Sequence, residues 1–265
     1  MQPFDKLRAN GYGRGMLRPI AAAALVTLLT GCTSTTGPRT AIDRALANVA
    51  NPSAVIATEL AFARMAREEG QWTAFRDYAA EDAVMFVPEA VRAQEWLEDR
   101  PDPAQAVQWQ PHQVWMSCDG SLAVTQGAAQ WPDGRPGSFV TVWERQRDGG
   151  YRWVMDQGGF VPEPLRAPDF IQTQIASCDP MPPTAQRVDP AGGVTTSFSS
   201  VDGSLHATTR IDPWCGRITE VRLFRGNPTD TDPPVTVRQM EQVFYRNTPP
   251  PPATDGAAPP QTCRR

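Results

Sequence analysis

Three side chains of this sequence are candidates for a catalytic proton transfer. Asp156 stands near the end of an apolar run, residues 151–157, where a carboxylate must be paired or functional because an unpaired buried charge is costly. His112 lies on a predicted strand among tryptophans, and Tyr78 ends a helical segment. Each has a structural alternative: Asp156 as an acid bonded to arginine or backbone amides, His112 as a surface residue and Tyr78 as part of the core.

Four tryptophans could bind a ligand rather than react with one. Pockets for small molecules are mostly apolar and aromatic, with few polar groups. The predicted strands therefore offer walls for an apolar or aromatic ligand at these positions: Trp109, Trp115, Trp143 and Trp153. Trp131 belongs to the same tryptophan-rich set, of which we expect two or three members to line a pocket. The alternative is that all four pack between helices and sheet as core.

Composition and motifs argue against several other functions. A net charge of −4 without a basic block argues against nucleic acid as a partner. Two histidines and no Cys-x-x-Cys argue against a structural zinc site, so we expect no metal. There is no phosphate-binding loop, dinucleotide glycine pattern or Gly-x-Ser-x-Gly, and we expect no cofactor.

The N-terminal segment resembles the export signal of bacterial lipoproteins. A positively charged stretch precedes the apolar run 20–29, which leads into Leu29-Thr30-Gly31-Cys32. The resemblance implies that residues 1–31 are a removed signal peptide and that Cys32 carries acyl chains such as palmitate, which anchor the protein to a membrane. By resemblance to sorted lipoproteins, Thr33 rather than Asp after this cysteine implies the outer membrane, with the chain facing the periplasm. Either Met1 or Met16 could be the start.

Export would place the other cysteines in an oxidising compartment. Four remain: Cys118, Cys178, Cys215 and Cys263, which allow three complete pairings that sequence cannot separate. We favour Cys178 with Cys215, because both occupy turn-like positions in the C-terminal region.

The periodicity of apolar residues changes along the chain from helical to alternating. Helical patterns cover residues 52–70, 72–80 and 91–97, around a short strand at 83–87. Strand patterns follow at 107–118, 122–131, 138–147 and 151–157. Helices followed by an antiparallel meander indicate an α+β fold.

The chain divides into five predicted parts. A signal peptide (1–31) and a flexible tether (32–52) precede the main domain (53–162). A β-rich extension (163–247) contains three strand patterns and a fourth segment that could be strand or helix. The proline-rich tail, 248–265, is expected to be disordered.

Six stretches of the main domain share the pattern of a known family: residues 61–70, 74–75, 80–88, 109–111, 119–127 and 142–158. Over about residues 55–160 the chain thereby resembles the SnoaL-like, NTF2-like superfamily, and most closely the domains grouped as domain of unknown function 4440. The first three stretches resemble the opening of the family's sequences. The resemblance implies a cone in which a curved antiparallel sheet wraps around helices and encloses a pocket. Members include ketosteroid isomerases and polyketide cyclases, which use a carboxylate as general base. It also implies homodimers formed through the open face of the sheet.

Three hypotheses follow. The first is a non-enzymatic envelope lipoprotein whose cone binds a small apolar ligand or a protein partner. The second is a periplasmic isomerase or cyclase with Asp156 as general base. The third is a structural dimerisation module. One fold hosts many functions, so the resemblance alone does not choose among them.

Overall fold

The computed structural model describes residues 49–87, 90–178, 195–211, 216–225 and 239–246. The predicted signal peptide, Cys32, Cys215, Cys263 and the proline-rich tail lie outside these ranges. None of the helices within them is long and apolar enough to cross a membrane.

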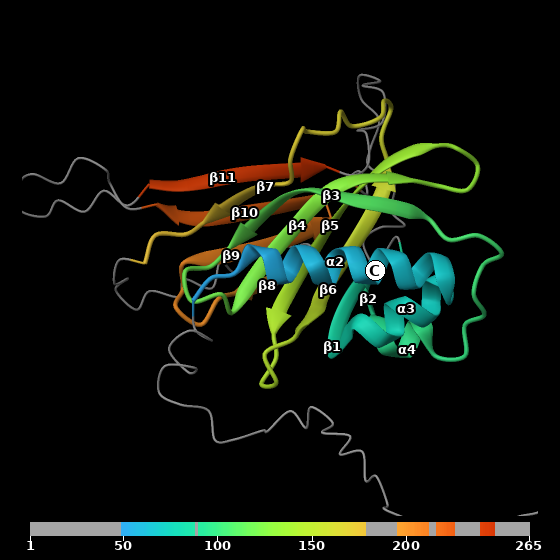
Figure 1. Ribbon diagram of the computed structural model, residues 1–265, viewed down its shortest axis with the longest axis horizontal. Coiled ribbons are helices and arrows are strands. Elements are labelled where there is room, and N and C mark those ends of the chain that lie inside the picture. The colour runs from blue at the N-terminus through green and yellow to red at the C-terminus, as the bar shows by residue number, and fades with distance from the viewer. Residues whose placement is uncertain (1–48, 88–89, 179–194, 212–215, 226–238, 247–265) are drawn as a thin grey trace, which may run out of the picture. The chain divides into compact units, whose positions relative to one another are not determined.

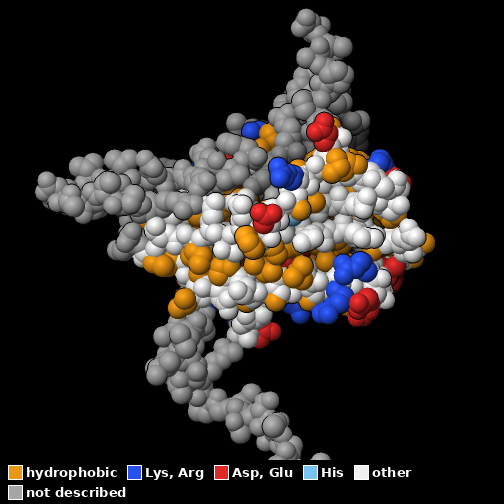
Figure 2. Space-filling view, turned by 45° about the horizontal axis from the view of Figure 1, so that its top comes forward, with side chains coloured by type: hydrophobic (Ala, Val, Ile, Leu, Met, Phe, Trp, Pro, Cys, Tyr) orange, Lys and Arg blue, Asp and Glu red, His pale blue; other side chains and the backbone are white. Residues whose placement is uncertain are grey.

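Three helices form one layer (Figure 1). They are α2 (Pro52–Glu68), α3 (Gln71–Tyr78) and α4 (Ala93–Leu97). The first two agree with the periodicity to within two residues. The third begins later than expected, because Ala90–Arg92 forms the short strand β2 instead. Figure 2 shows apolar side chains in a band across one face, with charged side chains gathered toward the end where Figure 1 places α3 and α4.

The junction between α2 and α3 depends on one glycine and one distant carboxylate. Gly70 has a φ of 128°, and a Cβ at this position would lie 2.3 Å from Oδ2 of Asp102. Asp102 accepts hydrogen bonds from the backbone N–H groups of Trp72 and Thr73 and, at 2.6 Å, from the Thr73 hydroxyl. These are unpaired donors of the first turn of α3, so a loop that is distant in sequence caps this helix.

The larger sheet has the strand order β2-β1-β6-β5-β4-β3-β7. Its other strands are β1 (Ala79–Phe86), β3 (Gln108–Met116), β4 (Leu122–Gln130), β5 (Pro136–Arg145), β6 (Tyr151–Phe160) and β7 (Gln172–Ile175). The predicted meander is confirmed as β3 to β6, all antiparallel. The expectation of an entirely antiparallel sheet is wrong, because β1 runs parallel to β6 and β7 runs parallel to β3.

The helices pack on one face of this sheet and enclose an aromatic core. The ring of Phe62 on α2 lies 4.8 Å from those of Phe75 on α3 and Trp109 on β3, and 6.0 Å from Trp143 on β5. These contacts join both helices to the centre of the sheet. The fold is therefore α+β, as the order of the sequence patterns indicates.

A second, antiparallel sheet has the order β11-β10-β9-β8. Its strands are β8 (Thr195–Ser199), β9 (Leu205–Ile211), β10 (Arg217–Arg225) and β11 (Gln239–Arg246), so the segment left open as strand or helix is a strand. It packs on the larger sheet: the Thr209 hydroxyl lies 3.8 Å from Sδ of Met155, and the Gln157 amide bonds to Thr219. Met155 and Gln157 alternate with Asp156, which faces the helices, so the second sheet covers the opposite face.

The structure corrects the predicted disulfide. Cys178 pairs with Cys118, with their Cα atoms 5.1 Å apart, and the pairing of Cys178 with Cys215 is therefore wrong. The reason is strand β7, which the sequence patterns did not include. Its parallel pairing with β3 sets Ile175 beside Met116, and each cysteine follows its strand by two or three residues.

Candidate functional site

A cavity of about 200 Å³ lies between α3, the end of β1 and the helix-facing side of the larger sheet. Its walls are mainly aromatic and aliphatic, which is the usual lining of a small-molecule site. The helix and β1 side contributes Gln71, Trp72, Phe75, Met85, Phe86 and Val87, and the remaining wall consists of Val107, Trp109, Ala129, Trp131, Phe139, Asp156 and Gly158.

Asp156 supplies the one ionisable side chain in this lining. It stands on β6 directly opposite Thr141 of β5, whose hydroxyl donates a 2.8 Å hydrogen bond to Oδ2. The residue is only 8% exposed, and burial raises the pKa of its carboxyl to about 7, with the Glu59 carboxylate adding to the rise. The Thr141 bond and the Arg217 guanidinium act in the opposite direction.

With this pKa, Asp156 can act in one way below neutral pH and in another way above it. Below about pH 7 the neutral acid can donate a hydrogen bond to a carbonyl or ether oxygen. Above it the carboxylate can accept a hydrogen bond or a proton. Among the residues that the structure describes, no three His, Cys, Asp or Glu side chains gather as a metal site would require.

Glu59 on α2 is a second buried carboxylate, behind the cavity wall. It is fully buried, and it accepts hydrogen bonds from Trp109 Nε1 at 2.7 Å, Trp143 Nε1 at 3.0 Å and the Thr125 hydroxyl at 2.6 Å. Burial raises its pKa, and the three hydrogen bonds oppose that rise. Because Trp109 also lines the cavity, Glu59 fixes the orientation of one wall.

Sequence reasoning missed Glu59, although a signal was present. It follows Val55 by four residues and precedes Phe62 by three, so it lies within the apolar stripe of α2. An acidic residue inside such a stripe must find buried partners, as it does here.

Trp131 stands between the cavity and a second hollow. A Cβ at Gly137 would lie 2.0 Å from the Trp131 ring, so only glycine permits this position of the indole. The Trp131 ring also lies 4.5 Å from that of Phe160, over which the Arg135 guanidinium is placed at 3.8 Å. Trp131 also lines both spaces.

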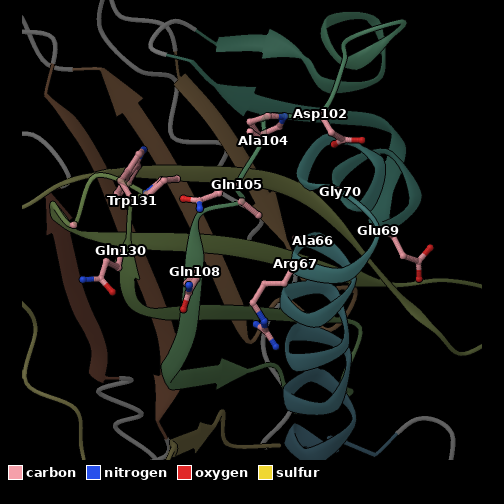
Figure 3. Close-up of a pocket in the computed structure, with 14 residues that line it drawn as sticks. Ala66, Arg67, Glu69, Gly70, Asp102, Ala104, Gln105, Gln108, Gln130 and Trp131 are labelled. Carbon is pink, nitrogen blue, oxygen red and sulfur yellow. The ribbon is translucent and has the colours of Figure 1, made fainter.

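The second hollow is a polar groove of about 660 Å³ between the C-terminal end of α2, residues 102–108 and the β4–β5 turn. Figure 3 shows the side chains of Gln105 and Gln108 between Arg67 on α2 and Trp131. Amide groups can both donate and accept hydrogen bonds. Its lining also contains the charged side chains of Arg67, Glu69 and Asp102, so the groove suits a polar group, next to a cavity that suits an apolar one.

Of the four predicted ligand-binding tryptophans, only Trp109 lines the cavity. The prediction of a direct ligand contact is wrong for the other three, which are 0% exposed and lie outside the cavity lining: Trp115, Trp143 and Trp153. Trp143 is held by Glu59, and Trp115 pairs with Val124 on the face opposite the helices. Trp131, a member of the tryptophan-rich set but not one of these four, supplies a wall instead.

Tyr78 and His112 also lie outside the cavity lining. The Tyr78 ring packs 5.1 Å from that of Phe62, and burial raises the pKa of its hydroxyl. His112 is half-buried at an irregularity of β3, and burial lowers the pKa of its imidazole. The structure therefore brings neither of these candidate proton donors to Asp156.

Comparison with known proteins yields fold likenesses only. No protein-family model and no curated protein matches the sequence. A solved structure from Parabacteroides distasonis, provisionally assigned as a ketosteroid isomerase, is 13% identical with a TM-score of 0.34, over 44% of this chain and 97% of that one. An NTF2-like protein of unknown function from Methylobacillus flagellatus is 13% identical with a TM-score of 0.32, over 42% of this chain and 91% of that one.

Removal of the Glu59 carboxylate should destabilise the fold strongly. We expect Glu59→Ala to lower the free energy of unfolding by ~3–5 kcal/mol, because Trp143 Nε1 and Trp109 Nε1 lose their acceptor inside the core. Urea unfolding measures the loss, with Glu68→Ala, on the exposed side of the same helix, as the matched control. Equal stability of both variants would show that Glu59 does not hold helix to sheet.

Proposed function

We propose that this protein binds a small molecule with one ring and one hydrogen-bonding substituent, and that Asp156 is the polar partner of that substituent. The observation that carries the proposal is a buried carboxyl group in the wall of an aromatic cavity of about 200 Å³. An apolar cavity of ~150 Å³ is known to take up benzene, so this one has room for a ring with a small substituent.

The same proposal assigns the main domain to the NTF2-like type. The sequence resemblance over residues 55–160 supports it, and so does a pocket enclosed between helices and one face of a curved sheet. The adjoining polar groove gives such a ligand room for a polar extension past Trp131.

Phenol and toluene test the role of Asp156 directly. At pH 8 we expect phenol to bind more tightly than toluene, because its hydroxyl donates to the ionised carboxylate. Asp156→Leu should weaken phenol binding roughly tenfold and leave toluene binding unchanged, since a hydrogen bond to a charged group contributes ~1.5–3 kcal/mol. Isothermal titration calorimetry measures both affinities.

Asp82→Leu serves as the control for this test, because Asp82 is exposed on β1 and outside the cavity lining. Equal loss of phenol and toluene binding in Asp156→Leu would indicate a collapsed cavity. Unchanged phenol binding would remove Asp156 from the proposal.

A second candidate function, proton abstraction next to a carbonyl group, is favoured by one specific observation. A pKa of about 7 places Asp156 close to the optimum for a general base at neutral pH. The cavity also excludes most water from this carboxyl group, as its 8% exposure indicates.

Exchange of the α-hydrogens of cyclohexanone in deuterated water tests this candidate by NMR. Only ionised Asp156 can act as base, so the protein-dependent rate should rise with pH and level off above about 7. Asp156→Asn should abolish this rate and Asp82→Asn should not. Equal exchange with and without protein would leave binding as the proposed function.

We also propose that the protein is a lipid-anchored envelope protein, probed through Cys32. The signal pattern before this residue supports the anchor, and the Cys118–Cys178 disulfide is typical of an exported chain. Labelled palmitate should enter the full chain expressed in a Gram-negative host, and Cys32→Ser should lose the label and leave the membrane fraction. Cys263→Ser is the control, and label retained in Cys32→Ser would refute the anchor.

A further inference from the structure

A six-residue sequence occurs twice in this chain. Residues 117–122 read Ser-Cys-Asp-Gly-Ser-Leu and residues 200–205 read Ser-Val-Asp-Gly-Ser-Leu, identical at five of six positions. The first joins β3 to β4 in the larger sheet, and the second joins β8 to β9 in the smaller one. The same turn therefore opens an antiparallel hairpin in each sheet.

The two turns also have the same internal hydrogen bonds. Asp119 Oδ1 accepts the hydroxyls of Ser117 at 2.7 Å and Ser121 at 2.8 Å. Asp202 Oδ1 accepts the hydroxyls of Ser200 and Ser204 at the same two distances. The glycines have φ values of 67° and 70°, in the left-handed region that favours glycine.

The two turns bind one another reciprocally. The backbone N–H of Asp119 donates to Asp202 Oδ2 at 3.0 Å, and that of Asp202 donates to Asp119 Oδ2 at 3.1 Å. The N–H of Cys118 donates to the Ser204 hydroxyl and that of Val201 to the Ser121 hydroxyl, both at 2.9 Å. Contacts in which residue i meets j while j meets i are the mark of a two-fold interface.

The equivalence extends into the strands that follow. Leu122 pairs with Glu144 across β4 and β5, and Leu205 pairs with Leu223 across β9 and β10. In both sheets the residue that follows the leucine's partner donates its backbone N–H to the carbonyl oxygen of the second serine of the turn. These bonds are Arg145 to Ser121 at 2.9 Å and Phe224 to Ser204 at 2.8 Å. The sheet order β6-β5-β4-β3 thus matches β11-β10-β9-β8.

We propose that the C-terminal sheet is an internal second copy of the β3–β6 meander and acts as the built-in partner of the larger sheet. The chain then completes within one molecule a two-fold interface that would otherwise take a second copy of the chain. The face of the larger sheet opposite the helices is covered here by residues of β9 and β10, such as Thr209 and Thr219. This inference does not depend on the proposed ligand.

The number of chains and the protection of the interface amides test the proposal together. Native mass spectrometry of the full chain in detergent should show one chain. Hydrogen exchange should show that the backbone amides of Asp119 and Asp202 are protected, and that this protection does not change with protein concentration. Two chains per particle with protection that disappears on dilution would overturn the proposal, as would one chain with unprotected amides at 201–202.

A pair of substitutions tests the reciprocity itself. Asp119→Ala removes the acceptor of the Asp202 amide, and Asp202→Ala removes that of the Asp119 amide, so each should speed exchange at the other turn by about tenfold. Asp133→Ala is the matched control, because in the described part of the chain Asp133 accepts its hydrogen bonds from Arg135, within its own turn. Substitutions that change exchange only in their own turn would overturn the interface.

Discussion

The buried carboxylate of Glu59 is the constraint on which the helix layer and the cavity depend. A charge that has left water requires partners, and Glu59 receives its three from β3, β4 and β5, through Trp109, Thr125 and Trp143. Helix α2 must therefore lie across these strands in one register. That register sets Phe62 against Trp109 and gives the cavity its rigid wall.

The two buried carboxyl groups on this face also influence each other. Repulsion by Glu59 adds to the burial of Asp156 and helps to keep its pKa near neutrality. Arg217 opposes this effect, and it comes from the second sheet: its guanidinium donates to the carbonyl oxygens of Phe86 at 3.0 Å and Gly158 at 2.8 Å, two residues of the cavity wall. The C-terminal sheet thus contributes to the electrostatics of a site that its own strands do not line.

The sequence predicted what depends on local periodicity and missed what depends on distant pairing. Helices α2 and α3 and the β3–β6 meander follow from apolar spacing and turn residues. Strand β7 does not follow from such patterns, because its four residues form a strand only through their pairing with β3. Since β7 brings Cys178 close to Cys118, the correct disulfide could not be predicted without this strand. Asp156 was identified by its apolar neighbours, whereas its partner Thr141 and the wall residue Trp131 depend on register and on space beside Gly137.

Because both faces of the sheet are covered, alternation of apolar and polar residues does not mark one face as the interior. In β5, residues 140–143 are consecutive and all 0% exposed, since Thr141 and Trp143 face the helices while Val140 and Val142 face the second sheet. A strand with such burial reads as a continuous apolar run. In the described part of the chain, the cavity lies on the helix-covered face, and there the sheet presents the small residues Ala129 and Gly158 beside Asp156. The second sheet covers the opposite face, through contacts such as that of Thr209 with Met155, and so leaves the helix-covered face to hold this cavity.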